Sequence, residues 1–154
     1  MDGSGKERGF TLIELLIVVA IIGIITAIAV PNLLNAIDKG KQKRSMADMR
    51  SIGSALEAYQ VDNAFYPRNY TTLAAVTGVA LWVEGPYLRN LPQSDGWGFP
   101  ILFASDAAGS GYTVRSAGKD GVTQSTYGAT TDFDCDIIFE DGTFIAFPQG
   151  RQQD

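Results

Sequence analysis

The residues Gly9-Phe10-Thr11-Leu12-Ile13-Glu14 lead directly into the apolar segment 15–30, and this part of the chain indicates the fold class. That segment holds sixteen residues without a charge, and Pro31 comes next. From Phe10 to Val30 the chain would form a helix of about 31 Å, at about 1.5 Å per residue, which spans a bilayer core of about 30 Å. The sequence therefore predicts a helix that crosses a membrane.

Three interpretations account for an apolar segment so close to the start of the chain. A cleaved secretory signal has a basic start, an apolar stretch and a small-x-small cleavage site, which Lys6, Arg8 and residues 27–29 supply. An uncleaved signal anchor is the second interpretation. In the third, a short charged leader is removed ahead of the apolar segment, which then stays in the mature protein.

Glu14 favours the third interpretation. A carboxylate near the start of a membrane helix costs on the order of 2.5–3.5 kcal/mol, so it needs a partner. A signal that is cleaved off has no use for such a residue. The helix dipole also favours a carboxylate near a helix start, and this simpler explanation of Glu14 stays open.

Residues 6–14, Lys-Glu-Arg-Gly-Phe-Thr-Leu-Ile-Glu, resemble the prepilin motif of type IV pilins and of the pseudopilins of type II secretion systems. The resemblance implies that a dedicated peptidase cuts after Gly9 and methylates the new amino-terminal Phe10. It also implies that Glu14 neutralises the amino-terminal ammonium of a neighbouring subunit in a filament. Buried opposite charges attract strongly and either one alone is penalised, so the pair would set the axial register between subunits.

Beyond Pro31 the predicted helix changes from uniformly apolar to amphipathic. Pro31 itself removes one backbone hydrogen bond, so it marks a point where the helix is weak. Further on, apolar residues recur at spacings of three and four, a pattern typical of one helix face: Met49, Ile52, Leu56 and Tyr59. We expect this face to pack against a head and the helix to end near Asp62-Asn63. The expected parts are a leader at 1–9, a transmembrane and assembly half of the helix at 10–31, an amphipathic half at 32–63 and a globular head at 64–154.

The head is expected to carry a small antiparallel sheet across the helix, which gives an α+β fold. A short helix is expected at Thr71–Thr77. Asp141-Gly142 is a strong signal for a two-residue hairpin between the last two strands. Turns at 65–67 and 91–100 resemble those of the major pseudopilin. The expected strands are Ile101–Ala104, Tyr112–Ser116, Cys135–Phe139 and Thr143–Phe147.

Composition excludes several classes of protein. The chain of 154 residues has no histidine and one cysteine, Cys135, with a net charge of −5. It therefore holds no Ser-His-Asp or Cys-His pair, no histidine-ligated zinc and no internal disulfide, and we expect no enzyme. Type IVa pilins usually close their carboxyl-terminal region with a disulfide, so a single cysteine favours the pseudopilin branch. The acidic balance argues against a nucleic-acid partner.

The segment 116–121, Ser-Ala-Gly-Lys-Asp-Gly, and the acids that follow it resemble the calcium loop of major pseudopilins. The resemblance implies a calcium ion with Asp120, Asp132 and Asp134 as ligands. Calcium suits such a loop because it takes six to eight oxygens in flexible geometry, backbone carbonyls included. Without a metal, the period-two spacing of Asp132, Asp134 and Asp136 is equally explained by the solvated face of a strand.

The resemblance implies a structural subunit that polymerises through its N-terminal helix into a type II secretion pseudopilus that drives protein export. Its expected partners are other copies, the prepilin peptidase, an inner-membrane assembly platform and minor pilin-like subunits. The precursor would cross the inner membrane once with its head in the periplasm, and then join a periplasmic or extracellular filament. The alternatives are a type IV pilus subunit for adhesion, motility or DNA uptake, and a soluble binding module released by cleavage after Ala29.

Overall fold

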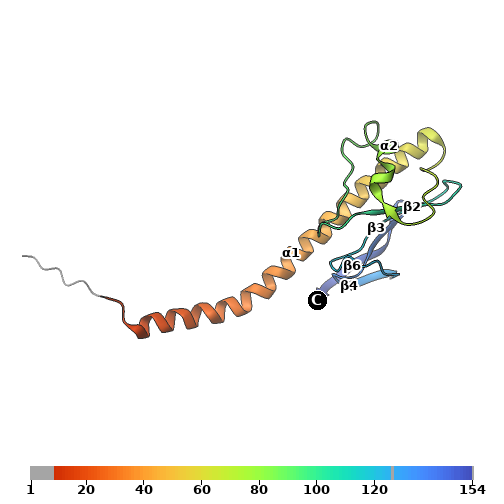
Figure 1. The fold of residues 1–154 in the computed structure, drawn as a ribbon. Helices are drawn as coiled ribbons and strands as arrows, with labels where there is room; N and C mark the ends of the chain where they lie inside the picture. Colours follow the sequence, from red (N-terminus) through yellow and green to blue (C-terminus); the bar gives the residue numbers. More distant parts are fainter. Residues whose placement is uncertain (1–8, 126, 154) are drawn as a thin grey trace, which may run out of the picture. The chain divides into compact units, whose positions relative to one another are not determined.

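A computed structural model describes residues 9–125 and 127–153 and divides the chain into two compact units, residues 1–36 and 37–154 (Figure 1). Apart from Gly9, the predicted leader lies outside the described residues. Helix α1, Leu12–Asn63, has 52 residues and contributes to both units. It ends where the sequence predicts.

The first unit holds the apolar part of α1. Its large apolar side chains are exposed from Phe10 to Leu34. Within the described part of the chain, α1 is the one helix long and apolar enough to cross a membrane. The helix continues through Pro31 without interruption.

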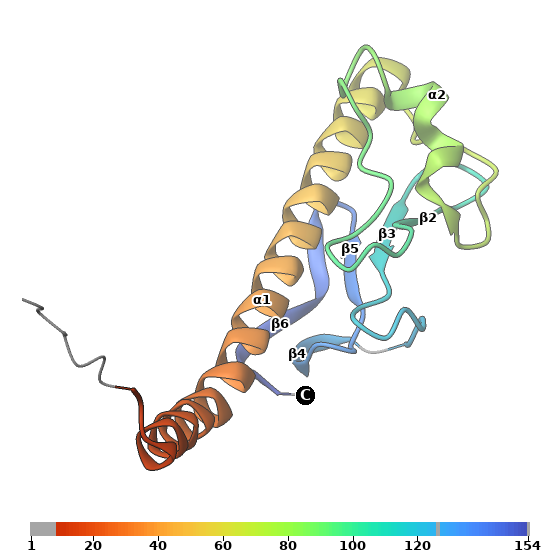
Figure 2. The same cartoon turned by 60° about the vertical axis from the view of Figure 1, so that its left-hand side comes forward.

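The second unit packs the rest of α1 on a sheet. The predicted stripe of Met49, Ile52, Leu56 and Tyr59 is buried, which confirms it as core. Figure 2 shows this part of α1 running along the sheet. Gly53 allows the close approach, because a Cβ at this position would lie 2.2 Å from the Cε1 atom of Phe139.

The sheet has six strands in the order β1-β2-β3-β5-β6-β4. Its neighbouring strands are antiparallel except for β4 and β6, which are parallel. The predicted α+β fold is confirmed, while the purely antiparallel sheet is corrected at this one pair. The strands are β1 Ala74–Ala75, β2 Leu102–Ser105, β3 Tyr112–Ser116, β4 Gly128–Asp132, β5 Ile137–Glu140 and β6 Thr143–Gln153.

The hairpin between β5 and β6 turns at Asp141-Gly142, as predicted. Both residues have positive φ, 44° and 86°, which is the conformation of a type I′ turn. The strand predicted to begin at Cys135 begins at Ile137 instead, because residues 133–135 form a turn ahead of it.

The helix predicted at Thr71–Thr77 is wrong. Ala74 and Ala75 pair with Phe103 and Leu102 of β2, so this stretch is extended. The helical residues come later, in the 3-10 helix η1, Val76–Val79, and in α2, Ala80–Val83. Pairing with a strand far along the chain decides the local structure here.

Candidate functional site

The start of α1 is closed by a reciprocal cap. The backbone N–H and the hydroxyl of Thr11 both donate to Glu14 Oε2 at 2.8 Å, and the Glu14 N–H donates to Thr11 Oγ1 at 3.2 Å. This is the capping box that a Thr-x-x-Glu sequence favours at a helix start. The sequence signal for this cap is a threonine, Thr11, followed three residues later by Glu14. The capping box gives Glu14 a role within its own chain and holds the Glu14 carboxylate at the amino end of the helix.

The predicted processing residues lie directly ahead of this cap. Gly9 and Phe10 are outside the helix, and the Phe10 side chain is 86% exposed. Nothing lies within 4 Å of the place where a Cβ of Gly9 would be. Both residues of the predicted cleavage site are therefore exposed.

Pro31, the third predicted assembly residue, lies inside α1. Proline has no N–H, so the Ala27 carbonyl four residues earlier loses its helical donor. One residue further along, the side-chain amide of Asn32 donates to the Ile28 carbonyl oxygen at 3.0 Å. The helix is thus continuous here but has one backbone hydrogen bond fewer.

The predicted calcium ligands lie in a second region, which we call the acidic loop, residues 117–136. Asp120 Oδ1 accepts the Val122 N–H at 2.9 Å, and Asp120 Oδ2 accepts from the Gln124 side-chain amide at 3.2 Å. The same amide lies 3.5 Å from the Asp134 carbonyl oxygen. The structure therefore brings the Asp120 carboxylate close to the main chain of Asp134.

The other predicted ligand groups are arranged differently. Asp132 Oδ1 accepts the Asp134 N–H at 3.0 Å, so this carboxylate supports the turn after β4. The Asp134 side chain is exposed. Among the described residues, no three acidic, cysteine or histidine side chains form a ready metal cluster.

Asp136 is the acidic residue of this loop whose burial sequence reasoning missed. It is fully buried and not on a solvated strand face, which corrects that interpretation of the period-two spacing. Its Oδ2 accepts the Gln124 N–H at 2.9 Å and lies 3.5 Å from Arg115 Nη1. Its Oδ1 is buried with no hydrogen-bond partner in the described part of the chain. Burial raises the pKa of this carboxyl, and the Gln124 N–H and Arg115 oppose the shift.

These oxygens are of the kind that calcium prefers. One carboxylate oxygen of Asp136 is buried and unpartnered, Asp120 carries a second carboxylate nearby, and the main chain of the 133–135 turn supplies carbonyls. Hard oxygen donors of this type suit Ca²⁺. The only sequence signal for Asp136 is its place directly before Ile137, at the acidic close of the loop.

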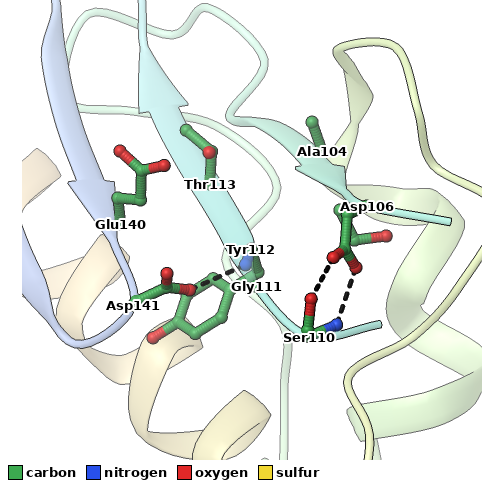
Figure 3. Close-up of a pocket in the computed structure, with 9 residues that line it drawn as sticks. Ala104, Asp106, Ser110, Gly111, Tyr112, Thr113, Glu140 and Asp141 are labelled. Carbon is green, nitrogen blue, oxygen red and sulfur yellow. Dashed lines mark hydrogen bonds between the residues drawn. The ribbon is translucent and has the colours of Figure 1, made fainter. Parts of the chain in front are cut away.

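A pocket of about 420 Å³ lies on the sheet near the turns that follow β2 and β5 (Figure 3). Asp106, Glu140 and Asp141 line it. Asp106 accepts from the backbone and hydroxyl of Ser110, and Asp141 Oδ1 accepts the Tyr112 N–H at 2.8 Å. Two of its carboxylates therefore hold turns in place.

Two parts of the sequence match known families. The family described as type II secretion system (T2SS), protein G matches residues 32–136. The chain belongs to this family. The prokaryotic N-terminal methylation motif matches residues 4–30, which include the Gly9–Phe10 bond and Glu14.

Sequence similarity to individual pseudopilins supports this assignment. The type II secretion system core protein G of Klebsiella pneumoniae is 32% identical over 127 residues, which cover 78% of this chain and 90% of the relative. The protein of the same name from Escherichia coli K12 is 30% identical over 128 residues, 79% of this chain and 88% of the relative. The protein of that name from Vibrio cholerae is 34% identical over 127 residues, which cover 79% of this chain and 86% of the relative.

The resemblance inferred from residues 6–14 is thereby confirmed. The chain is a pseudopilin, a structural component of type II secretion and not an enzyme. Its N-terminal apolar helix and its processing motif associate it with the inner membrane and with pseudopilus assembly.

Proposed function

We propose that this pseudopilin polymerises through the apolar part of α1 into a pseudopilus that drives protein export. The observation that carries the proposal is the exposure of every large apolar side chain from Phe10 to Leu34. An apolar surface this extensive needs a partner, either lipid or other helices of the same kind. The precursor would lie in the inner membrane with its head in the periplasm, and the filament would bury the same surface.

Glu14 would become an assembly residue once the leader is removed. Cleavage after Gly9 turns the Phe10 nitrogen into an ammonium, and the capping box holds the Glu14 carboxylate at the same end of the helix. In an apolar bundle each of these charges is costly alone and favourable as a pair. The Phe10 ammonium of a neighbouring subunit would supply the opposite charge.

The other partners follow from this cycle. The prepilin peptidase would process the Gly9–Phe10 bond, an inner-membrane platform would add subunits, and minor pilin-like subunits would join the filament. The family match disfavours a surface pilus subunit. A soluble module released after Ala29 is disfavoured as well, because that cut would fall inside α1.

Glu14→Gln tests the assembly role. Glutamine retains the capping box, since it also accepts from Thr11, but removes the charge. We expect the variant to be processed and to remain in the membrane, while filaments recovered by shearing and seen by electron microscopy fall to a small fraction of the wild-type yield. Filaments of normal yield and length would overturn the charge-pair role of Glu14.

We also propose that the acidic loop binds calcium. Asp120, Asp136 and the Asp134 carbonyl are its best-supported ligands, and the carboxylates of Asp132 and Asp134 are the further predicted ones. Calcium would compensate the buried charge of Asp136 and tie the loop together where a disulfide is absent.

A thermal melt tests this proposal. We expect calcium to raise the melting temperature of the wild type by several degrees over a chelator, and Asp120→Asn to abolish most of that difference. Glu84→Gln, a change at an exposed acid outside the acidic loop, is the matched control and should retain the difference. Identical wild-type curves with calcium and with chelator would overturn the proposal.

A further inference from the structure

Asp38 is a buried carboxylate on α1 for which the proposed function gives no role. It is the first buried residue along the helix and is 8% exposed. A carboxylate in such a place is costly unless donors surround it. Three donors from three segments lie near: Lys119 Nζ is 3.3 Å from Oδ2, while Trp97 Nε1 and Lys41 Nζ are 3.4 Å and 3.8 Å from Oδ1.

Lys119 connects this carboxylate to the acidic loop. Its backbone N–H donates to the Phe133 carbonyl at 2.9 Å, and its Nζ lies 5.8 Å from the centroid of the Phe133 ring. Beside it, Gly118 has a φ of 72°, and a Cβ there would lie 2.6 Å from the Asp134 carbonyl oxygen. The main chain of Lys119 is thus fixed in the loop, whereas its side chain ends on the helix.

The turn at 95–100 contacts the same few residues of α1. Ser45 Oγ accepts the Gly96 N–H at 2.9 Å. Gly96 lies so close to the helix that a Cβ would be 2.1 Å from the Lys41 carbonyl oxygen. Residues 38–45 of α1 therefore hold two loops at once, and the Asp38 carboxylate receives donors from both.

We propose that Asp38 is a positioning residue whose ion pair with Lys119, which we call the clasp, holds the acidic loop against α1. Cation binding in the loop then protects the backbone amides of residues 38–45 from hydrogen exchange. The coupling rests on the calcium binding proposed above, but the clasp itself needs only the Lys119–Asp38 ion pair. Because only residues 32–37 separate residues 38–45 from the predicted assembly half of α1 at 10–31, an ordered acidic loop stabilises the helix shortly after that half.

Amide hydrogen exchange of the full chain in detergent micelles, read by mass spectrometry, tests the clasp. Lys119→Met removes the charge but keeps an apolar stem. Lys43→Met is the matched control, because Lys43 is exposed on the same helix and forms no ion pair within the described residues. Without calcium, we expect exchange at 38–45 to rise about two- to fivefold in Lys119→Met and not in the control. Equal rates in the two variants would overturn the clasp.

Millimolar calcium then tests the coupling. In the wild type and in Lys43→Met, exchange should slow at both 118–124 and 38–45, whereas in Lys119→Met it should slow at 118–124 alone. Equal calcium protection of 38–45 in Lys119→Met and the wild type would overturn the coupling through Asp38. A wild type with no calcium effect at 118–124 would overturn calcium binding and with it the coupling, and the calcium-free rates then decide the clasp by themselves.

A second variant, Asp38→Asn, tests the clasp independently in case the Lys119→Met protein misfolds. Asp38→Asn removes the charge from the helix side and keeps an acceptor for Trp97. It should reproduce both patterns of exchange, and wild-type exchange at 38–45 in this variant would also overturn the clasp.

Discussion

Gly96 sits against the backbone of α1 with no room for a side chain, since a Cβ would lie 2.1 Å from the Lys41 carbonyl oxygen. Gly96→Ala should therefore push the 95–100 turn off the helix and lower the free energy of unfolding by about 1–3 kcal/mol. Gly40→Ala is the control, because nothing lies within 4 Å of that Cβ, and it should raise the free energy by about 0.5–1 kcal/mol. Denaturant unfolding followed by circular dichroism measures both. A Gly96→Ala variant as stable as the wild type would contradict the close packing.

Tyr112 gives the fold a dependence on alkaline pH. Burial, and next the charge of Glu57, raise the pKa of its phenol above the ordinary value of about 10. Above that pH the unfolded chain loses this proton while the folded chain keeps it, so the free energy of unfolding falls as pH rises. Tyr112→Phe should lose less stability than the wild type between about pH 9 and pH 11. Tyr127→Phe, at a side chain 66% exposed, should lose as much as the wild type, and an equal loss in both variants would contradict this account.

The sequence predicts structural features correctly where they depend on interactions between residues close together in the chain. The Asp141-Gly142 hairpin and the approximate end of α1 at Asn63 depend on residues next to one another, and both are confirmed. Asp136 is different. Its spacing from Asp132 and Asp134 suggests a solvated face, whereas its burial depends on the turn at 133–135 and on Arg115 of β3. No local pattern carries that information.

At the scale of elements, α1 should be least stable around Pro31. The missing N–H leaves the Ala27 carbonyl without its helical donor, and a proline inside a helix costs about 3 kcal/mol. Pro31→Ala should therefore slow amide exchange at residues 28–35 by about tenfold or more. Exchange at residues 49–59, which the head covers, serves as the internal control and should change little. Unchanged exchange at 28–35 would remove Pro31 as a source of weakness.

The sheet shows which elements the sequence could not predict. Strands β3 and β6 were foreseen from their composition and turns, although β6 extends to Gln153. Strand β1 consists of two alanines whose extended form comes from pairing with β2, and β4 runs parallel to β6. Both depend on partners distant in the chain, so neither has a signature in its own residues.

At the scale of the whole molecule, the chain combines an apolar stretch of α1, from Phe10 to Leu34, whose large side chains are exposed, with a head that packs a buried core. Membership in the protein G family and the methylation motif associate that stretch with the inner membrane and with pseudopilus assembly. The boundaries of the predicted parts at residues 9 and 31 remain predictions. The first residue of the mature chain tests the boundary at residue 9.

Removal of the leader is tested by the mass and sequence of the amino terminus, measured on protein recovered from the membrane and filament fractions. We predict a chain that begins at Phe10 with a methylated amino group and retains the whole apolar segment. A mature protein that begins at Val30, or one that keeps its leader, would contradict it.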